Sequence, residues 1–488
     1  MQTQAQTSAV ERRQGWLLIT VAAGVFVAAD DQTSIVTVLP ALIRDIGLTV
    51  DDLYQASWIV NGYLLGYIVA LPIVGRVADV YGHARVYSGA LALFMLGSVL
   101  VAIGPGFEAI VVSRVIQAVG GGAVVPVAMA IVVDELPKER RLLGLGVIAA
   151  ASEAGALIGP LWGGAITEWL GWRAVFWINV PMSLPILVVA WRLVGSTRRG
   201  GAIDWLGAAL LGGSLAVVTF ALVDDPSGGR PLSVTALMLI AAAGLAALFW
   251  WHEHRTLAPL VRPGMLCSRE VVAANATNLL LGGGLITVLI GVPLFVNLVL
   301  AESSLDGGLT LMRLTIAVPV GALAGGWLGG RYGLRTVAVG GMLLAAVGFV
   351  GLQAWDGQSL ELLRTVPLLV GGFGFGLVIA PLSAVVLQHV GEEERATAAS
   401  WLTLSRVVGM LIGAALLTSS GLGRFYARAG TIDFDSPEFD TLVLEAEVST
   451  FREVFVVAAV AMVVAAAIAW WIGRGERDSD RKQWWMIT

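Results

Sequence analysis

The sequence GRVADVYGHARV, which begins at Gly75, lies between two long apolar runs. A related sequence, GWLGGRYGLRTV, begins at Gly326 and also lies between two apolar runs. The glycine that follows the tyrosine is Gly82 in the first copy and Gly333 in the second, 251 residues later. A repeat of this length indicates two related halves, an arrangement common in transporters that place a site between two bundles.

Two further matches have nearly the same offset. Arg140 in PKERR corresponds to Arg395 in EEER, 255 residues later, and Gly159 in ALIG corresponds to Gly413 in MLIG, 254 residues later. Six helices with their loops are shorter than this offset, so about two helices must lie between the copies. We therefore predict an N-terminal six-helix bundle, an inserted helix pair with its linkers, a C-terminal six-helix bundle and a cytoplasmic tail, at residues 1–195, 196–270, 271–475 and 476–488.

The composition places these helices in a membrane. Hydrophobic residues make up 57% of the 488 residues, charged residues make up 13%, and the mean hydropathy is +0.82, which excludes a soluble protein. The apolar runs are continuous rather than alternating, so they predict helices that cross a bilayer with about 20 residues each. The fourteen predicted spans are about 16–40, 57–78, 86–104, 108–133, 143–169, 173–195, 204–224, 232–252, 272–301, 309–330, 335–354, 363–388, 397–421 and 451–473.

The basic residues predict the orientation. Lys and Arg are concentrated in the loops that share a face with both termini, for example at Arg12, Arg140 and Arg255, and such loops stay in the cytoplasm. We therefore expect a multi-pass protein of the bacterial cytoplasmic membrane with both termini in the cytoplasm. The net charge is −5 and the basic residues are scattered over short loops, so no nucleic-acid-binding patch is expected.

Four motifs, in order along the chain, resemble those of the major facilitator superfamily, in its fourteen-helix drug-proton antiporter branch. They are GRVADVYGHAR from Gly75, RVIQ from Arg114, GALIGPLWGG from Gly155 and IDWLGAALL from Ile203. The resemblance covers all fourteen predicted helices. It implies an all-α membrane protein with the major facilitator fold, two six-helix bundles plus two inserted helices, and transport by alternating access.

Within that branch, the likeness is greatest to the triacylglyceride exporters of mycobacteria. It rests on YLLGYIVALPIVGR, FWINVP, PVGALAGGWL, GLVIAPLS and RVVGMLIGA, and on a long hydrophilic segment before the last helix. The first helix also departs from the usual drug exporters, which have one acidic residue followed by TIVNVALP. Here Asp30 and Asp31 are followed by QTSIVTVLP.

Ionisable side chains inside the bilayer are costly, and they face the bundle interior or water. Asp30 and Asp31 are adjacent, so they point about 100° apart on the first helix. We select Asp31 as the main proton-coupling carboxylate because the resemblance aligns it with the acidic residue of related exporters. Arg114 and Gln117 lie one turn apart on the fourth helix, and the resemblance associates them with proton transfer. The alternative is that these residues only join neighbouring helices.

Glu153 and Arg406 lie at nearly matching positions of the two repeats, shortly before the LIG sequences. The repeat would bring their helices to opposite sides of a central cavity. We hypothesise that they form an ion pair that closes one side of the cavity and breaks in the other state, because buried partners attract strongly yet are costly to desolvate. Two independent hydrogen-bonding residues are the alternative.

The first motif is expected to act as a gate on the cytoplasmic side. Asp79 and Arg85 would lock one bundle to the other by charge pairing. Gly75 and Gly82 would allow a tight turn, because glycine tolerates backbone conformations that other residues avoid. Ordinary orientation-setting charge is the alternative.

The exporter motif on the fifth helix contains a glycine stripe. Gly155, Gly159 and Gly163 are four residues apart, so they lie along one face, where small residues let another helix approach. Pro160 is expected to bend or loosen the helix, and Gly164 completes the motif. Packing explains the stripe by itself, and its connection with export comes from the resemblance alone.

Polar side chains that could line a cargo site are few. The candidates are Asn61, Asn179, Asn275, Asn278 and Asn297, among Gly, Val, Leu and Trp. Such an apolar site suits a lipophilic molecule. No GxxxxGK[ST] sequence is present, so ATP hydrolysis is not the expected energy source. No metal or cofactor is expected, and no enzyme, because the four histidines join no nucleophile or metal motif.

These features together predict a proton-coupled antiporter that exports lipophilic compounds, with a triacylglyceride-type lipid slightly favoured as cargo. The first alternative is a multidrug efflux pump for hydrophobic or cationic drugs. The second is a lipid scramblase or a non-transporting sensor. The expected partners are the cargo, protons, membrane lipids and a periplasmic lipoprotein that accepts a lipid cargo, and the expected state is a monomer.

Overall fold

The chain folds into long helices. The computed structural model describes residues 2–47, 53–193, 200–222, 231–257, 259–262, 264–265, 268–302, 304–356, 361–417, 421–429 and 439–473, and no strand occurs among them. The predicted tail at residues 476–488 lies outside these ranges. The all-α class predicted from the continuous apolar runs is confirmed.

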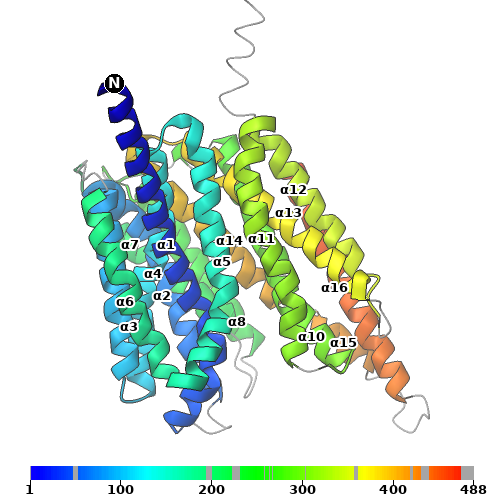
Figure 1. The fold of residues 1–488 in the computed structure, drawn as a ribbon. Coiled ribbons are helices and arrows are strands. Elements are labelled where there is room, and N and C mark those ends of the chain that lie inside the picture. The colour runs from blue at the N-terminus through cyan, green and yellow to red at the C-terminus, as the bar shows by residue number, and fades with distance from the viewer. Residues whose placement is uncertain are drawn as a thin grey trace, which may run out of the picture. The chain divides into compact units, whose positions relative to one another are not determined.

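The helices follow one another along the chain (Figure 1). The first eight are α1 (Gln2–Asp45), α2 (Leu53–Tyr81), α3 (His83–Ile103), α4 (Phe107–Glu135), α5 (Lys138–Leu170), α6 (Trp172–Leu193), α7 (Trp205–Leu222) and α8 (Leu232–Glu253). The others are α10 (Arg269–Leu298), α11 (Ser304–Tyr332), α12 (Leu334–Leu352), α13 (Glu361–Gln388), the short η2 (Glu392–Glu394), α14 (Arg395–Leu416), α15 (Leu422–Ala429) and α16 (Phe439–Ala469).

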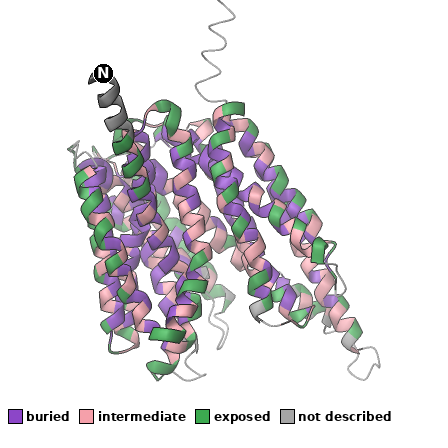
Figure 2. Ribbon diagram, in the orientation of Figure 1, coloured by how far each residue is buried: buried purple, intermediate pink, exposed green. Residues whose placement is uncertain are grey.

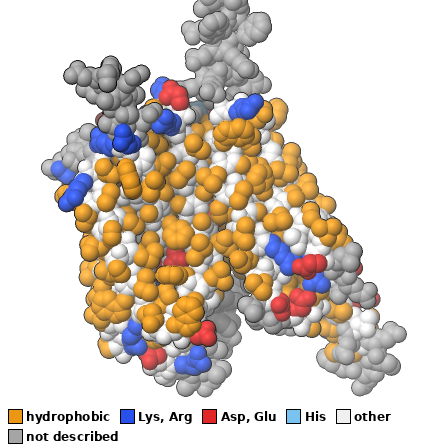
Figure 3. Space-filling view, viewed as in Figure 1, with side chains coloured by type: hydrophobic (Ala, Val, Ile, Leu, Met, Phe, Trp, Pro, Cys, Tyr) orange, Lys and Arg blue, Asp and Glu red, His pale blue; other side chains and the backbone are white. Residues whose placement is uncertain are grey.

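Thirteen helices among the described residues are long and apolar enough to cross a membrane, and α7 is an apolar but shorter helix. Hydrophobic side chains cover most of the visible helix faces, and most charged side chains lie near helix ends (Figure 3). Several helices continue past the predicted spans: α1 begins at Gln2 and α16 at Phe439. Helical hydrogen bonds form within the segment itself, so a helix can extend beyond its apolar part.

The chain divides into two compact units. The first comprises Met1–Ser268 with Val386–Leu404, and the second comprises Arg269–Val385 with Ser405–Thr488. The inserted pair, α7 and α8, therefore groups with the first unit, and the first turns of α14 do so too. In each unit, the buried residues follow the helix faces that meet other helices (Figure 2).

Both units use glycine at matching helix contacts. In the first unit α5 packs closely on α1, since a Cβ atom added to Gly155 would lie 2.3 Å from the carbonyl oxygen of Phe26. In the second unit α14 packs closely on α10, where a Cβ atom on Gly409 would lie 1.9 Å from the carbonyl oxygen of Leu279. The helix pairing therefore repeats, as the sequence offsets predict.

The turns before α3 and α12 repeat as well. Gly82 precedes α3 with a φ of 97°, and Gly333 precedes α12 with a φ of 93°. This left-handed region strains residues that have a Cβ atom. The expectation that Gly82 allows a tight turn is therefore met by its backbone conformation.

Candidate functional site

A buried polar cluster lies inside the first unit. Arg114 Nη1 in α4 donates hydrogen bonds to Asp31 Oδ2 in α1 at 2.9 Å and to Gln117 Oε1 at 2.7 Å. Gln117 Nε2 donates to Asp31 Oδ1 at 2.9 Å. At most 1% of each residue is exposed. The structure thus brings together three of the four residues that the sequence indicates for proton coupling.

Two side chains from other helices complete this cluster. Asn179 Nδ2 in α6 donates to Asp31 Oδ1 at 2.7 Å. Ser98 Oγ in α3 accepts from Gln117 Nε2 at 2.6 Å and from Asn179 Nδ2 at 3.2 Å. Asn179 is one of the five asparagines that the sequence suggests for a polar site, whereas Ser98 is not predicted. We refer to Asp31, Ser98, Arg114, Gln117 and Asn179 as the polar cluster.

The Arg114 guanidinium lies against two aromatic rings. Its Cζ atom is 4.3 Å from the ring centre of Tyr63 in α2 and 5.8 Å from that of Phe176 in α6. Aromatic faces attract cations, most strongly where water is excluded. Neither Nε nor Nη2 of Arg114 has a hydrogen-bond partner among the described residues. Asp31, Gln117 and the two rings are therefore its main stabilising contacts.

Asp30 does not join the polar cluster. Its side chain is buried, and its Oδ1 atom has no hydrogen-bond partner among the residues that the structure describes. The neighbouring Asp31 accepts the hydrogen bonds from Arg114, Gln117 and Asn179. The helical rotation between adjacent residues thus separates the two carboxylates, as expected.

Close helix contacts hold the polar cluster in place. A Cβ atom on Gly97 in α3 would lie 2.4 Å from the Cα atom of Gln117, so α3 and α4 meet next to the cluster. On α5, a Cβ atom on Gly159 would lie 2.4 Å from the carbonyl oxygen of Asp30, and one on Gly163 would lie 2.8 Å from that of Ser34. The predicted glycine stripe therefore faces the backbone of α1 beside Asp30 and Ser34.

The rest of the exporter motif contributes differently. Helix α5 runs unbroken from Lys138 to Leu170 through Pro160, whose carbonyl oxygen accepts a hydrogen bond from Thr37 Oγ1 at 3.0 Å. A Cβ atom on Gly164 would have only ordinary contacts, the nearest at 3.7 Å from Thr37 Cβ. Close packing thus depends on the stripe and not on every glycine of the motif.

A second polar group lies at the end of the first unit that carries the α2–α3 connection. Asp79 Oδ1 accepts the backbone N–H of Ala396 at 2.9 Å, and Oδ2 accepts the N–H of Thr397 at 2.9 Å and its hydroxyl at 2.6 Å. These amides begin α14, where they have no acceptor within the helix and carry partial positive charge. Asp79 therefore caps the N-terminus of α14.

His83 connects this cap to α4. Its Nε2 atom lies 3.0 Å from Asp79 Oδ1, and its Nδ1 atom lies 2.8 Å from Asp134 Oδ2. Arg395, the first residue of α14, also pairs with Asp134. A carboxylate only accepts hydrogen bonds, so the ring donates to both when both nitrogens carry protons. We call Asp79, His83, Asp134, Arg395 and the first amides of α14 the latch.

Two details differ from the expected gate. Arg85 is exposed, and no ion pair joins it to Asp79 among the described residues, so the partners of Asp79 are His83 and α14. Gly75 is not in a turn but inside α2, and a Cβ atom there would lie 2.8 Å from the carbonyl oxygen of Ala396. Its function in the structure is to let α14 approach α2.

Glu153 and Arg406 belong to different units. Glu153 lies in α5 of the first unit, and Arg406 lies in the part of α14 that belongs to the second. The backbone of Arg406 is also a contact point within its own unit, since a Cβ atom on Gly282 in α10 would lie 2.1 Å from its carbonyl oxygen. The ion pair between the two side chains stays a prediction.

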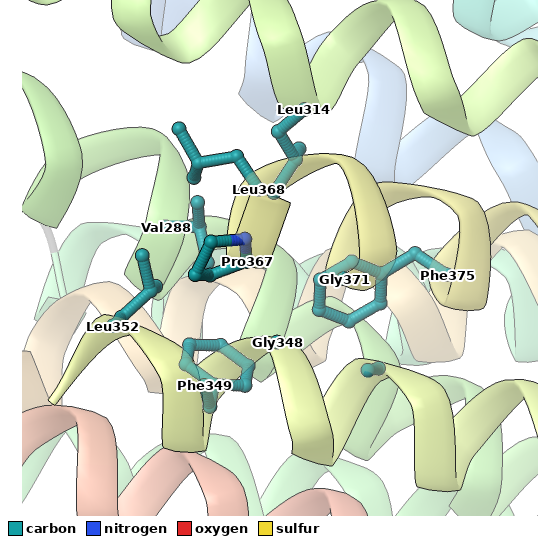
Figure 4. Close-up of a pocket in the computed structure, with 10 residues that line it drawn as sticks. Val288, Leu314, Gly348, Phe349, Leu352, Pro367, Leu368, Gly371 and Phe375 are labelled. Carbon is teal, nitrogen blue, oxygen red and sulfur yellow. The ribbon is translucent and has the colours of Figure 1, made fainter. Parts of the chain in front are cut away.

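A small pocket in the second unit is apolar. Helices α10 to α13 line it, and Figure 4 shows Phe349, Phe375, Leu314 and Pro367 around it. Gly348 and Gly371 lie at one side, where α12 and α13 approach each other. Its lining includes no charged residue, so the pocket offers only hydrophobic contacts.

The chain matches one family model and is similar to several known transporters. The family model described as Major Facilitator Superfamily matches residues 21–414 and also residues 278–483. The chain is 34% identical, over 476 residues, to a triacylglyceride transporter of Mycolicibacterium smegmatis, a match that covers 92% of this chain and 84% of that protein. It is 32% identical over 490 residues to a triacylglyceride transporter of Mycobacterium tuberculosis, with 94% of both chains covered.

Two solved structures have the same fold. The human organic anion transporter MFSD10 is 18% identical with a TM-score of 0.64, and the match covers 93% of this chain and 99% of that one. The proton:xylose symporter XylE is 15% identical with a TM-score of 0.65, covering 94% and 96%.

Proposed function

The chain belongs to the Major Facilitator Superfamily, a family of transporters and not of enzymes, and we propose that it is a proton-coupled exporter of lipophilic compounds across the cytoplasmic membrane. The favoured cargo is a lipid of the triacylglyceride type. The observation that carries the proposal is the buried Asp31–Arg114 pair inside the polar cluster. Both termini would lie in the cytoplasm, and the protein would act as a monomer.

The polar cluster supports proton coupling for an electrostatic reason. Burying two charges is costly, and they are retained only when each compensates the other. A proton on Asp31 would remove one charge and leave the Arg114 guanidinium without its counter-charge. Protonation would thereby weaken the contact between α1 and α4, which gives proton entry a means to shift the balance between two transporter states. Asp30 is a secondary candidate, because it is buried beside this pair.

The latch supports a closed state on the cytoplasmic side. Asp79 bonds to backbone amides of α14, and Gly75 gives α14 the space to reach them. Breaking these bonds would free α14 from α2 and open that side. Arg85 would then contribute positive charge to the cytoplasmic loop rather than a contact of the latch.

The choice of cargo is supported by the relatives and by the scarcity of polar side chains. The relatives that cover most of the chain are named triacylglyceride transporters. Such a lipid has no charge, so it needs an apolar route and a carrier beyond the membrane. A periplasmic lipoprotein that accepts the lipid is therefore part of the proposal.

A reconstituted transport assay tests this function. Proteoliposomes with an imposed pH gradient are given either a fluorescent triacylglyceride or a cationic dye. Lipid transport that depends on the gradient is the expected result. Transport of the dye alone would favour a multidrug efflux pump, and lipid movement that is unaffected by the gradient would favour a scramblase.

The proposed pair of Glu153 and Arg406 is tested by exchanging its charges. We expect Glu153→Arg and Arg406→Glu each to reduce transport strongly, because each leaves two like charges facing one cavity. The double variant should recover a substantial part of the activity. Single variants that lose transport, with no recovery in the double variant, would contradict direct pairing.

The latch predicts a change in accessibility. Asp79→Asn removes the charged acceptor for the two amides of α14, and hydrogen bonds to charged groups contribute about 1.5–3 kcal/mol each. A cysteine placed on the cytoplasmic route should then react with a thiol reagent at least about 10-fold faster, because tenfold corresponds to about 1.4 kcal/mol. Arg85→Ala is the matched control and should leave the rate unchanged.

A further inference from the structure

Two side-chain amides bridge Asp31 and Ser98 in the same way. Gln117 Nε2 lies 2.9 Å from Asp31 Oδ1 and 2.6 Å from Ser98 Oγ. Asn179 Nδ2 lies 2.7 Å from the same carboxylate oxygen and 3.2 Å from the same hydroxyl. One carboxylate and one hydroxyl thus hold amide groups from both α4 and α6, and at most 3% of any of these residues is exposed.

This arrangement suits only the ionised form of Asp31. Oδ1 accepts two amide hydrogens and Oδ2 accepts one from Arg114, so all three neighbours are donors. A protonated carboxyl group carries a hydrogen of its own and must donate it. If Oδ1 takes the proton, at least one amide must withdraw, because two donors cannot share that contact.

Asn179 is the neighbour that can transmit this change to another helix. Arg114 and Gln117 both lie on α4 and bond each other, so they move as one group. Asn179 is the single polar cluster residue on α6, whereas Ser98 is the one on α3. The charged or titratable groups around Asp31 are Arg114 from α4, Tyr63 from α2 and Asp30 from α1 itself. Helix α5 presents Gly155 and Gly159 to α1.

We propose that Asn179 is a positioning residue that couples the protonation of Asp31 to the placement of α6. Ser98 accepts a hydrogen bond from the Asn179 amide in both protonation states of Asp31. The inference rests on the proton coupling proposed above. In the ionised state, Asn179 ties α6 to α1 and α3. When Asp31 takes up a proton, the amide loses its acceptor on Oδ1, keeps only Ser98, and the tie between α6 and α1 is released.

The test is the pH profile of gradient-driven transport in proteoliposomes, measured with the fluorescent triacylglyceride. Asn179→Ala removes one hydrogen-bond donor from the ionised carboxylate of Asp31. Asp31 should then remain protonated at a proton concentration about tenfold lower than in the unchanged protein. The midpoint of the profile should therefore shift by about 1 pH unit to higher pH. Asn179→Ser, which keeps a shorter donor, should give a smaller shift in the same direction.

Thr219→Val is the matched control, because Thr219 is buried in α7, outside the polar cluster, and its hydroxyl donates to the carbonyl oxygen of Leu215 in its own helix at 2.8 Å. Its profile should coincide with that of the unchanged protein. A lower rate with an unmoved midpoint in both Asn179 variants would overturn the inference and leave Asn179 with a packing role. Absence of any gradient dependence in the unchanged protein would instead overturn the proposed function.

Discussion

Asp31→Asn is expected to abolish gradient-driven transport in proteoliposomes. The amide cannot take up a proton, and it leaves the Arg114 guanidinium buried without a counter-charge. Breaking one side of a buried pair costs about 3–5 kcal/mol. That cost should lower the unfolding temperature, whereas driven transport should fall to the background rate because no proton can be taken up at position 31. The initial rate of cargo movement under a fixed pH gradient measures this loss.

Asp30→Asn compares the secondary candidate carboxylate with Asp31. Asp30 is also buried in α1, but it makes no hydrogen bond with the polar cluster among the described residues, so its replacement should have a much smaller effect. The double variant Asp31→Asn with Arg114→Gln should regain thermal stability without regaining driven transport. Undiminished driven transport in Asp31→Asn would contradict a proton-carrying role.

Gly159→Ala is expected to destabilise the first unit. The new methyl group would lie 2.2 Å from Thr33 Oγ1 and 2.4 Å from the carbonyl oxygen of Asp30. Thr33 can rotate, but the Asp30 carbonyl belongs to the backbone of α1, so the two helices must separate. Overpacking of this kind typically costs about 1–3 kcal/mol. The unfolding temperature of the purified protein should fall, and transport should fall with it, because Asp31 is the next residue of α1.

Gly164→Ala is the control within the same motif. Its added methyl group would meet only Thr37, at 3.7 Å or more. The replacement should therefore leave the unfolding temperature unchanged or raise it slightly, since alanine favours helices by about 1 kcal/mol over glycine. Equal losses of stability in both variants would show that the stripe is not what brings α1 and α5 together.

The helices could be predicted because lipid imposes one simple requirement on the sequence. Each apolar run satisfies its own backbone hydrogen bonds, so its position follows from composition alone. The ends could not be predicted in the same way. The segment FDTLVLEAEVSTF predicts a helical extension beyond the membrane, and α16 includes it, but its acidic residues break the apolar run, so the first helical residue, Phe439, does not follow from composition.

The site was predictable as far as it depends on spacing within one helix. Arg114 and Gln117 are three residues apart, so their common direction follows from helical geometry. Ser98 lies in α3 and carries no such signal, because its importance arises from contact with two other helices. The partner of Asp79 was missed for a similar reason: backbone amides of α14 are present in any sequence, so nothing in the residue types indicates them.

The turns at Gly82 and Gly333 show which features of the repeat occur in both halves of the chain and which occur in one. Both copies of the duplicated segment keep the left-handed glycine, with φ values of 97° and 93°. The carboxylate is present in one copy only, since the position that matches Asp79 is Gly330. The left-handed turn is thus a requirement of the backbone in both halves. The carboxylate serves the latch, which occurs in the first half only among the described residues. Each half of the molecule therefore serves as a reference for the other.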